Sequence, residues 1–438
     1  MQAVELTVAS LAPGGDGLAH VVIDGERRAV FLPDTAPGDV VRADLDASRR
    51  PARGRVLEVL SAGPGRVPSA CPWSTRCGGC DWMHLSLEAQ GRAHVEHVLA
   101  ALPAAWRGAP ATHHAAVEGL AYRTRARLHV RWERGRIEVG MHETGTHDPV
   151  VVDVCAVLEP AVENARRNLG ALFQGSRGQG DVQIALGSER RPVLEVRWTG
   201  EIADSCFARL EQAVKAGELA GARVLVGDAS RPAVVGDPTP WVPGADDVPL
   251  RLAPGGFGQA SERMNATLAL HVAALVRPLA VDKAVELYAG SGNLSVVLAR
   301  EVRELVLVES SREACDAARA NLAARGLRAR VVEADAAAYA WGATTRLVVL
   351  DPPRTGARAV AERLAASRVP HVVYVSCDPQ TLGRDLALLA PGYVARSVAT
   401  FEMFPQTSHV ETVVALERVR GRQVSGSAGA WSKPGGRS

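Results

Sequence analysis

The first 60 residues alternate between apolar and polar positions in the manner of short β-strands. This alternation covers residues 3–11, 19–23, 27–33 and 39–46. The intervening stretches APGGDG, DGE and DTAPGD are turn sequences. A two-residue period broken by Gly and Asp-Gly turns predicts a small antiparallel barrel. We therefore assign residues 1–62 to an OB-like β-barrel.

The pattern between residues 63 and 248 is mixed. A cysteine-rich segment comes first, and a helical stretch at 85–102 follows it. Alternating residues at 125–133, 135–142, 182–187 and 192–198 then predict strands. Residues 63–248 are thus predicted to form a β-rich central domain.

From about residue 249 the chain alternates regularly between strand and helix patterns. Five short segments are apolar and rich in β-branched residues, and helical stretches such as 311–326 separate them. This order predicts an α/β, doubly wound, Rossmann-like domain over 249–418, with a parallel sheet covered on both faces. Its ligands should bind at the carboxyl ends of the strands. Residues 419–438 lack periodicity and are predicted to be a disordered tail.

Composition and charge narrow the class of protein. The 438 residues suffice for two or three domains. No apolar run reaches the roughly 20 residues of a membrane helix, so we expect no membrane partner. Seven cysteines and the lack of a signal-like start indicate a reducing cytoplasm. The net charge is only +2, but arginines cluster at 49–55 and 122–136. These clusters are either RNA-binding surfaces or ordinary solvated faces.

The first strand of the α/β domain leads into a glycine turn. Gly290 and Gly292 would let the backbone approach a ligand at a helix N-terminus. Glu309 ends the next strand, where a carboxylate can bind both ribose hydroxyls, and Asp335 ends the third, where it can meet an adenine amino group. Ser295 replaces the third glycine of a dinucleotide fingerprint. Adenosine without a pyrophosphate suits S-adenosylmethionine, although ordinary turn chemistry is the alternative interpretation.

The fourth strand ends in Asp351, and two prolines and Arg354 follow it. The prolines stiffen the strand exit and fix the direction of the Asp351 carboxylate. Methyltransferases that act on amino groups often carry an aromatic residue after such a Pro-Pro pair. Arg354 at that position argues against exocyclic amine chemistry.

The fifth strand ends in Cys377, at the mouth of the same predicted cleft. A thiolate there could add to C6 of a pyrimidine, which makes C5 nucleophilic toward a sulfonium methyl group. The C5 proton must then leave. Glu411, at the start of an apolar strand, is the candidate base, whereas His409 is interpreted as structural. Cys206 and Cys315 are interpreted as buried, unreactive cysteines.

Three further cysteines lie within ten residues. Cys71, Cys77 and Cys80 are spaced as metal ligands, the glycines between the last two supply a tight turn, and Cys155 is the candidate fourth ligand. Such spacing occurs for structural zinc and for iron-sulfur clusters, and the residues alone do not separate them. Free thiols are the remaining alternative.

Several motifs together resemble the family of uracil-C5 RNA methyltransferases, which form 5-methyluridine in ribosomal and transfer RNA. The motifs are FGQASERMN, ELYAGSGN, LDPPRTG, SCDPQTLGRDL and FPQTSHVETV. The resemblance implies a TRAM-like barrel, Cys377 as the nucleophile, Glu411 as the base and a 4Fe-4S cluster in place of zinc. It also implies cofactor and target-base contacts from Gln259, Tyr288, Asn293, Glu309, Asp335 and Asp351.

The resemblance favours ribosomal RNA over transfer RNA as the substrate, and we expect a monomer. Three positions depart from the usual pattern, since many members have Asn at 378, His at 406 and in some cases Asn at 335. The rivals are a transfer RNA uridine-54 enzyme, a DNA cytosine methyltransferase and a catalytically idle RNA-binding protein. DNA cytosine enzymes usually carry proline before the nucleophile, where this chain has Ser376. Retention of Cys377 and Glu411 argues against an idle binder.

Overall fold

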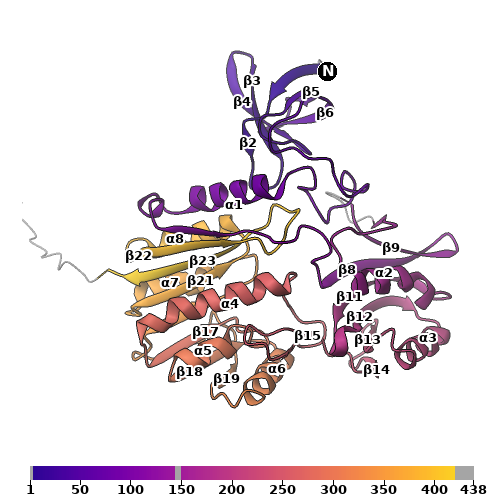
Figure 1. The fold of residues 1–438 in the computed structure, drawn as a ribbon, viewed down its shortest axis with the longest axis vertical. Helices are drawn as coiled ribbons and strands as arrows, with labels where there is room; N and C mark the ends of the chain where they lie inside the picture. Colours follow the sequence, from indigo (N-terminus) through magenta and orange to yellow (C-terminus); the bar gives the residue numbers. More distant parts are fainter. Residues whose placement is uncertain (1–2, 144–148, 420–438) are drawn as a thin grey trace, which may run out of the picture.

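The N-terminal strands form a closed sheet in the computed structural model, which describes residues 3–143 and 149–419 (Figure 1). The strands are β1 (Ala3–Thr7), β2 (Ser10–Leu11), β3 (Gly17–Ile23), β4 (Glu26–Leu32), β5 (Val40–Asp46) and β6 (Ala52–Ser61). Their order is β1-β5-β6-β4-β3-β2. Because β1 pairs with β5 and its continuation β2 pairs with β3, the two edges meet and the sheet closes. The four segments predicted to be strands are strands, and β6 is an additional one.

A second sheet forms the central region. It has the order β10-β9-β8-β11-β12-β13-β14. Its strands are β8 (Arg125–Glu133), β9 (Arg136–His142), β10 (Pro149–Val151), β11 (Arg177–Leu186), β12 (Pro192–Glu201), β13 (Gly221–Val226) and β14 (Ala233–Gly236). Helices α2 (Pro160–Leu172) and α3 (Asp204–Lys215) cover one face, where Phe173 stacks on Trp198. The opposite face carries mainly polar side chains. On this face, Arg125 donates to the Gly256 carbonyl, which lies in the loop before α4 (Glu262–Val276).

The third sheet has eight strands in the order β19-β18-β17-β20-β21-β23-β22-β7. The strands are β7 (Ala111–His114), β17 (Lys283–Leu287), β18 (Glu304–Glu309), β19 (Arg330–Glu333), β20 (Leu347–Leu350), β21 (His371–Ser376), β22 (Tyr393–Phe401) and β23 (Glu411–Arg418). Strands β17 to β21 are mutually parallel, and β23 is antiparallel to both of its neighbours. The predicted parallel α/β arrangement is confirmed.

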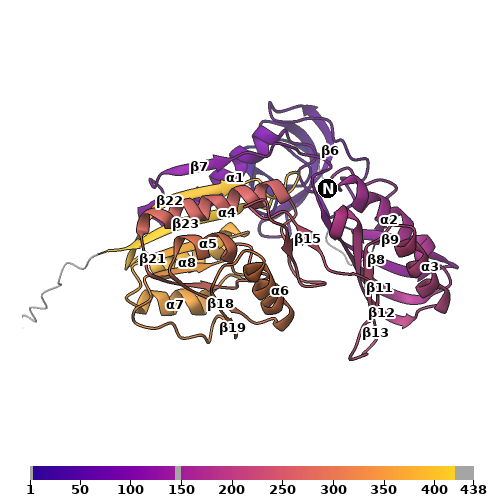
Figure 2. The same cartoon turned by 60° about the horizontal axis from the view of Figure 1, so that its bottom comes forward.

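Helices cover both faces of this sheet (Figure 2). One face packs against α4 (Glu262–Val276), α5 (Ser295–Glu301) and α6 (Arg312–Ala323). The other packs against α7 (Arg358–Ala366), α8 (Pro379–Leu389) and α1 (Leu87–Ala101). A short hairpin of β15 (Trp241–Val242) and β16 (Leu250–Arg251) leads from the central sheet into α4. The α/β domain is therefore doubly wound.

Two elements from the N-terminal half join the third sheet. Strand β7 pairs in parallel with β22, and α1 buries Val98 in the same hydrophobic core as α8. Residues 63–248 were predicted to form one central domain, yet part of that range covers the edge and one face of the C-terminal sheet. An uncovered β22 would expose its backbone groups to pairing with other chains, and β7 prevents this.

The described residues contain no helix long and apolar enough to cross a bilayer. The tail predicted at 419–438 lies outside the described residues from position 420 onward.

Candidate active site

The candidate residues gather along one edge of the third sheet. The strand order places the loops after β18, β17, β20 and β21 side by side. These loops carry Glu309, the glycine turn, Asp351 and Cys377 in that spatial sequence. Because β23 runs antiparallel, its first residue, Glu411, lies at the same edge. The topology thus brings together residues separated by more than 100 positions in the chain.

The glycine turn is held in a defined conformation by side chains around it. Tyr288, Gly290 and Gly292 have φ values of 61°, 54° and 89°. Such positive φ angles are uncommon for a residue with a side chain, so Tyr288 is conformationally restrained. The Glu309 carboxylate accepts the Gly290 N–H at 3.0 Å and the Ser311 N–H at 2.8 Å. Glu309 therefore lies directly beside the turn, where the sequence predicted a ribose-binding carboxylate.

Two buried asparagines brace the turn. Asn293 and Asn265 of α4 exchange two side-chain hydrogen bonds of 2.8 and 2.9 Å. Asn321 of α6 donates to the Ser291 carbonyl at 2.8 Å, accepts the Arg251 N–H at 2.9 Å and donates to the Arg251 carbonyl at 2.8 Å. These bonds fix the turn from both of its flanks.

Asp335 lies two residues beyond the end of β19. Its side chain is exposed and accepts the Ala337 N–H at 2.9 Å, which forms a local turn. It approaches Tyr288, whose pKa is raised by burial and by the negative charge of Asp335. Asp335 thus lies at the same edge of the sheet as Glu309 and the glycine turn, beside the outermost strand β19.

Strand register sets the position of the candidate nucleophile and base. Ser376 at the end of β21 pairs with Thr412 of β23. In antiparallel strands, the residue after Ser376 stands across from the residue before Thr412. Cys377 is therefore adjacent to Glu411, and their charges interact. Asp378 caps α8 by accepting the Thr381 N–H at 2.8 Å, which fixes the backbone immediately after the cysteine.

Gln259 completes this group from the loop before α4. Its side chain hydrogen-bonds to the Glu411 carboxyl group. Within the described part of the chain, Gln259 Oε1 and Glu411 Oε2 are buried and lack a hydrogen-bond partner. Buried polar atoms are rarely left unpaired in a folded protein. Two unpaired oxygens beside a thiol indicate a site built to receive a polar ligand.

Burial and mutual repulsion dominate the electrostatics of the site. Burial raises the pKa of Asp351 to about 7, and burial together with the charge of Asp351 raises the pKa of Glu411 well above its usual value. The pKa of Cys377 rises to about 12, mainly through burial and then through Glu411 and Asp351. Arg354 opposes these shifts in both Cys377 and Glu411. At neutral pH a thiol with this pKa is protonated.

A further buried carboxyl group lies within β17. Glu286 is 2% exposed and accepts a hydrogen bond of 2.6 Å from the Ser295 hydroxyl. Burial raises its pKa to about 8, and Asp351 and Glu309 add to the shift. Glu286 was not predicted as a site residue, although a carboxylate in an apolar strand is the same signal that identified Glu411 at the start of its strand.

Two of the departures from the family pattern have structural roles. Gln406 is buried with a φ of 72°, and its backbone N–H and side chain bond to Gln90. It also donates to the Gly119 carbonyl at 3.2 Å. Gln406 therefore ties its loop to α1, and Asp378 serves as the helix cap described above. His409, interpreted as structural, lies edge-on to Phe404, and burial lowers its pKa.

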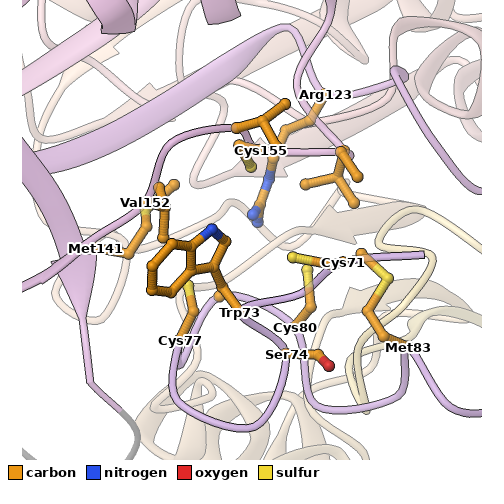
Figure 3. A pocket seen from close by; sticks show the side chains of 14 residues that line it. Cys71, Trp73, Ser74, Cys77, Cys80, Met83, Arg123, Met141, Val152 and Cys155 are labelled. Carbon is orange, nitrogen blue, oxygen red and sulfur yellow. The ribbon is translucent and has the colours of Figure 1, made fainter. Parts of the chain in front are cut away.

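The four candidate metal-ligating cysteines line one pocket (Figure 3). Cys71, Cys77 and Cys80 come from the loop before α1, and Cys155 comes from the segment before α2. The Arg123 side chain points into the same pocket. Burial raises the pKa values of Cys77 and Cys155, and that of Cys80 reaches about 12.

These four thiols do not form a single-ion site. Among the described residues, no group of three or more His, Cys, Asp or Glu side chains is arranged to hold a metal ion. All seven cysteines are free, and Cys206 and Cys315 are buried as predicted. The pocket thus gathers all four predicted ligands, although their side chains are not arranged as a preformed metal site.

The arginine clusters are less positive than their sequences suggest. In the barrel, Arg49, Arg53 and Arg55 pair with aspartates. In the central sheet, Arg131 and Arg136 both pair with Glu138. The partners of Arg49 and Arg136 are close to them in the sequence, whereas those of Arg53, Arg55 and Arg131 are brought near only by strand pairing.

Two relatives among curated proteins align with nearly the whole chain. The 23S rRNA (uracil(1939)-C(5))-methyltransferase RlmD of Halomonas elongata is 35% identical over 94% of this chain and 89% of its own length. The protein of the same name from Pseudomonas putida is 32% identical over 92% of this chain and 91% of its own length.

Two family models match the C-terminal region. The tRNA (Uracil-5-)-methyltransferase model covers residues 329–419, and the Methyltransferase small domain model covers residues 253–370. Among solved structures, the tRNA (uracil-54, C5)-methyltransferase of Pyrococcus abyssi, crystallised with S-adenosyl-L-homocysteine, superimposes with a TM-score of 0.71. It is 21% identical, and the match covers 94% of this chain and all of that one. This match establishes the fold.

Proposed function

The chain belongs to the family of RNA uracil-C5 methyltransferases, and on that premise we propose that it forms 5-methyluridine in 23S rRNA, at the position equivalent to uridine 1939. The relatives with this specificity match almost its full length. The observation that carries the chemical proposal is the Ser376–Thr412 register, which brings Cys377 beside Glu411. A 23S rRNA substrate also implies action in the cytoplasm, where ribosomes are assembled.

We assign the cofactor side of the cleft to the glycine turn and its neighbours. S-adenosylmethionine, when bound, supplies an electrophilic methyl group. Gly290 and Gly292 would let the backbone contact it closely, and Glu309 would accept hydrogen bonds from its ribose hydroxyls. Tyr288, Asn293 and Asp335 complete the proposed cofactor contacts, and Asp351 lies between the cofactor and the target base. The bracing by buried asparagines keeps this turn preorganised.

The target uracil would enter beside Cys377 after flipping out of the RNA. The unpaired Gln259 Oε1 can accept the N3–H of uracil, a donor that a 5-methylated product retains and that cytosine lacks. Cys377 adds to C6, and C5 becomes nucleophilic and takes the methyl group. Glu411 then removes the C5 proton, the C5–C6 double bond re-forms, and the Cys377 thiolate leaves.

The high pKa of Cys377 defines when the nucleophile can be activated. Burial and two carboxyl groups raise the pKa of the thiol and keep it protonated at neutral pH. Its proton must therefore leave after the ligands enter, and a positive charge near Asp351 would favour that loss. A protonated resting thiol also resists alkylation and oxidation.

We propose that Cys71, Cys77, Cys80 and Cys155 hold a 4Fe-4S cluster. In such a cluster each thiolate binds a different iron, so the four sulfurs lie farther apart than around one zinc ion at about 2.3 Å. Four partly buried thiols around one pocket fit this donor set. When bound, the cluster would link two distant segments, and methyl transfer requires no electron from it. Iron and sulfide analysis after anaerobic purification tests this assignment.

The polar face of the central sheet and the barrel form the proposed RNA surface, with the barrel resembling a TRAM domain. Within the described residues, Arg127 and Arg197 are exposed on that face and have no salt-bridge partner. They lie on β8 and β12, and the intervening β11 pairs with both strands. The face turns toward the loop that carries Gln259, so RNA bound there would reach the catalytic edge.

The test uses unmodified 23S rRNA transcript, transfer RNA transcript and radiolabelled S-adenosylmethionine. Wild type should label the 23S transcript at the position equivalent to uridine 1939, Cys377→Ala should be inactive, and Glu411→Gln should accumulate a covalent RNA adduct. The adduct forms because addition proceeds while elimination lacks its base. Label in transfer RNA at uridine 54 would instead assign the transfer RNA reaction, and free turnover by Glu411→Gln would remove the proposed role of that residue.

A further inference from the structure

We propose that Asp81 and Tyr122 are positioning residues for the base Glu411. They lie in residues 71–82 and 122–124, here called the cysteine-lined region because Cys71, Cys77, Cys80 and Arg123 line the pocket described above. They act through residues 404–410, here called the catalytic loop, which leads directly into Glu411. This inference rests on the proposed function, because it concerns the step in which Glu411 removes the C5 proton.

Three direct contacts join the cysteine-lined region to the catalytic loop. The Asp81 carboxylate accepts the Ser408 N–H at 2.9 Å. The neighbouring Trp82 N–H donates to the Gln406 carbonyl at 3.0 Å. The Tyr122 hydroxyl donates to the Pro405 carbonyl at 3.0 Å. Asp81 and Trp82 directly follow Cys80, and Tyr122 precedes Arg123, which lines the pocket of the four cysteines.

The catalytic loop needs such external support. Gln406 adopts a φ of 72°, which non-glycine residues rarely adopt. The loop is buried along most of its length, so its backbone groups depend on protein partners in place of water. Only two residues separate Ser408 from Glu411. A shift of the loop would therefore displace the base.

The same region also holds the hydrogen-bond partner of Glu411. The Thr124 N–H donates to the Ala260 carbonyl at 3.1 Å, one residue after Gln259. The Arg123 N–H donates to the Val157 carbonyl at 2.9 Å, two residues after Cys155. Gln259 and Glu411 are thus both anchored to backbone that borders the cysteine pocket.

The nucleophile is anchored elsewhere. Cys377 is fixed by β21 and by the Asp378 cap of α8. None of the hydrogen bonds described in the preceding paragraphs joins β21 or α8 to the cysteine-lined region. Loss of the Asp81 or Tyr122 contact should therefore move the base more than the nucleophile. Addition and methyl transfer would continue, and proton removal would slow. The bond between Cys377 sulfur and C6 would persist, because its electrons return to sulfur only when the C5–H electron pair forms the C5–C6 double bond.

The decisive variants are Asp81→Ala and Tyr122→Phe, and each has a matched control. Tyr393→Phe removes another buried hydroxyl that donates to a backbone carbonyl, that of Val369 at 2.8 Å. Asp237→Ala removes another carboxylate that accepts a backbone N–H, that of Thr239 at 3.0 Å. Neither control residue belongs to the proposed site. Asp81→Asn keeps an oxygen acceptor for the Ser408 N–H and serves as the conservative rescue.

The measurement is a single-turnover reaction with unmodified 23S rRNA transcript and S-adenosylmethionine. Two readouts are followed: methyl incorporation, and the fraction of protein in an adduct that survives denaturing electrophoresis. We expect Asp81→Ala and Tyr122→Phe to release product on the order of tenfold more slowly, as the loss of one buried hydrogen bond allows, with a matching rise in adduct. Asp81→Asn and both controls should resemble wild type. Iron content should stay unchanged in Tyr122→Phe, whose substitution lies outside the four cysteines.

A purely structural role gives a different result. Lower methyl incorporation with no rise in adduct, in parallel with a lower melting temperature, would overturn the proposal. Wild-type release rates in both Asp81→Ala and Tyr122→Phe would do so as well. Because Tyr122→Phe removes a single atom, it decides the question if Asp81→Ala fails to fold. Failure of the proposed function is recognised separately, by the absence of adduct in Glu411→Gln.

Discussion

Asn321 offers the most direct test of how the fold prepares the cofactor site. Its side chain is 1% exposed and forms three hydrogen bonds, to both backbone groups of Arg251 and to the Ser291 carbonyl in the glycine turn. The substitution Asn321→Ala removes all three and leaves their backbone partners unpaired. No other described side chain bonds to the Ser291 carbonyl.

The expected loss of stability in Asn321→Ala depends on how deeply these backbone partners are buried. An unpaired buried polar group costs about 1–3 kcal/mol. The Ser291 carbonyl is buried, whereas Arg251 lies at an exposed position where water can replace part of the loss. We therefore expect a loss of roughly 2–4 kcal/mol in the free energy of unfolding of the C-terminal domain. For a domain of this size that corresponds to a fall in melting temperature of roughly 4–16 °C.

The assay is thermal unfolding with and without S-adenosylhomocysteine, together with the dissociation constant of that ligand from calorimetry. The variant should bind the ligand on the order of tenfold more weakly, because the turn must be ordered upon binding. Asn168→Ala, the same substitution at an exposed position of α2, is the control. A melting temperature within about 1 °C of wild type and an unchanged dissociation constant would refute the assigned role of Asn321.

Three further predictions concern charge. The pKa of Glu286 is raised from 4.5 to about 8 in the fold, so its stabilising contribution is complete below pH 4.5 and is lost as pH rises through 8. Glu286→Gln should therefore raise the melting temperature relative to wild type at pH 9 more than at pH 5, and equal effects would contradict this. With a pKa of about 12, Cys377 in the ligand-free enzyme should react with iodoacetamide about tenfold faster for each pH unit between 7 and 10, as followed by mass spectrometry. A rate that levels off near pH 8 would contradict the buried, protonated thiol. Arg127→Glu and Arg197→Glu should each weaken binding of 23S rRNA transcript and reduce its salt dependence, and unchanged titrations at two salt concentrations would exclude this face as the RNA surface.

The chemical roles of the proposed catalytic residues could be predicted from the sequence, but the contacts between these residues could not. Cys377 and Glu411 were predicted from their places at strand ends, because strand ends are where α/β sheets bind ligands. Their adjacency depends on the Ser376–Thr412 register, which is set by packing over the whole sheet. No local pattern marks that register.

Contacts between distant parts of the chain explain why some elements and residue roles could not be predicted from the sequence. Strand β7 (Ala111–His114) shows no alternation, because it is an edge strand whose side chains are largely exposed. Asn321 lies in an ordinary amphipathic helix, and its role depends on two loops that approach from elsewhere. The aspartate partners of Arg53 and Arg55 are likewise distant from them in the sequence. The periodicity of apolar residues shows which face of a helix or strand is buried. The roles of these residues depend instead on which other segment of the chain packs against that face.

The antiparallel insertion of β23 beside β21 has a consequence for redesign. Because successive residues of a strand point to opposite faces, a slip of β23 by one residue against β21 would turn the Glu411 carboxylate away from the thiol. The spacing of thiol and carboxylate is therefore inherited from the hydrogen-bond ladder and is insulated from changes in the surrounding loops. An engineer could exchange the barrel or recontour the central sheet to redirect the enzyme to another transcript and still retain its reaction, provided that this one pair of strands keeps its alignment.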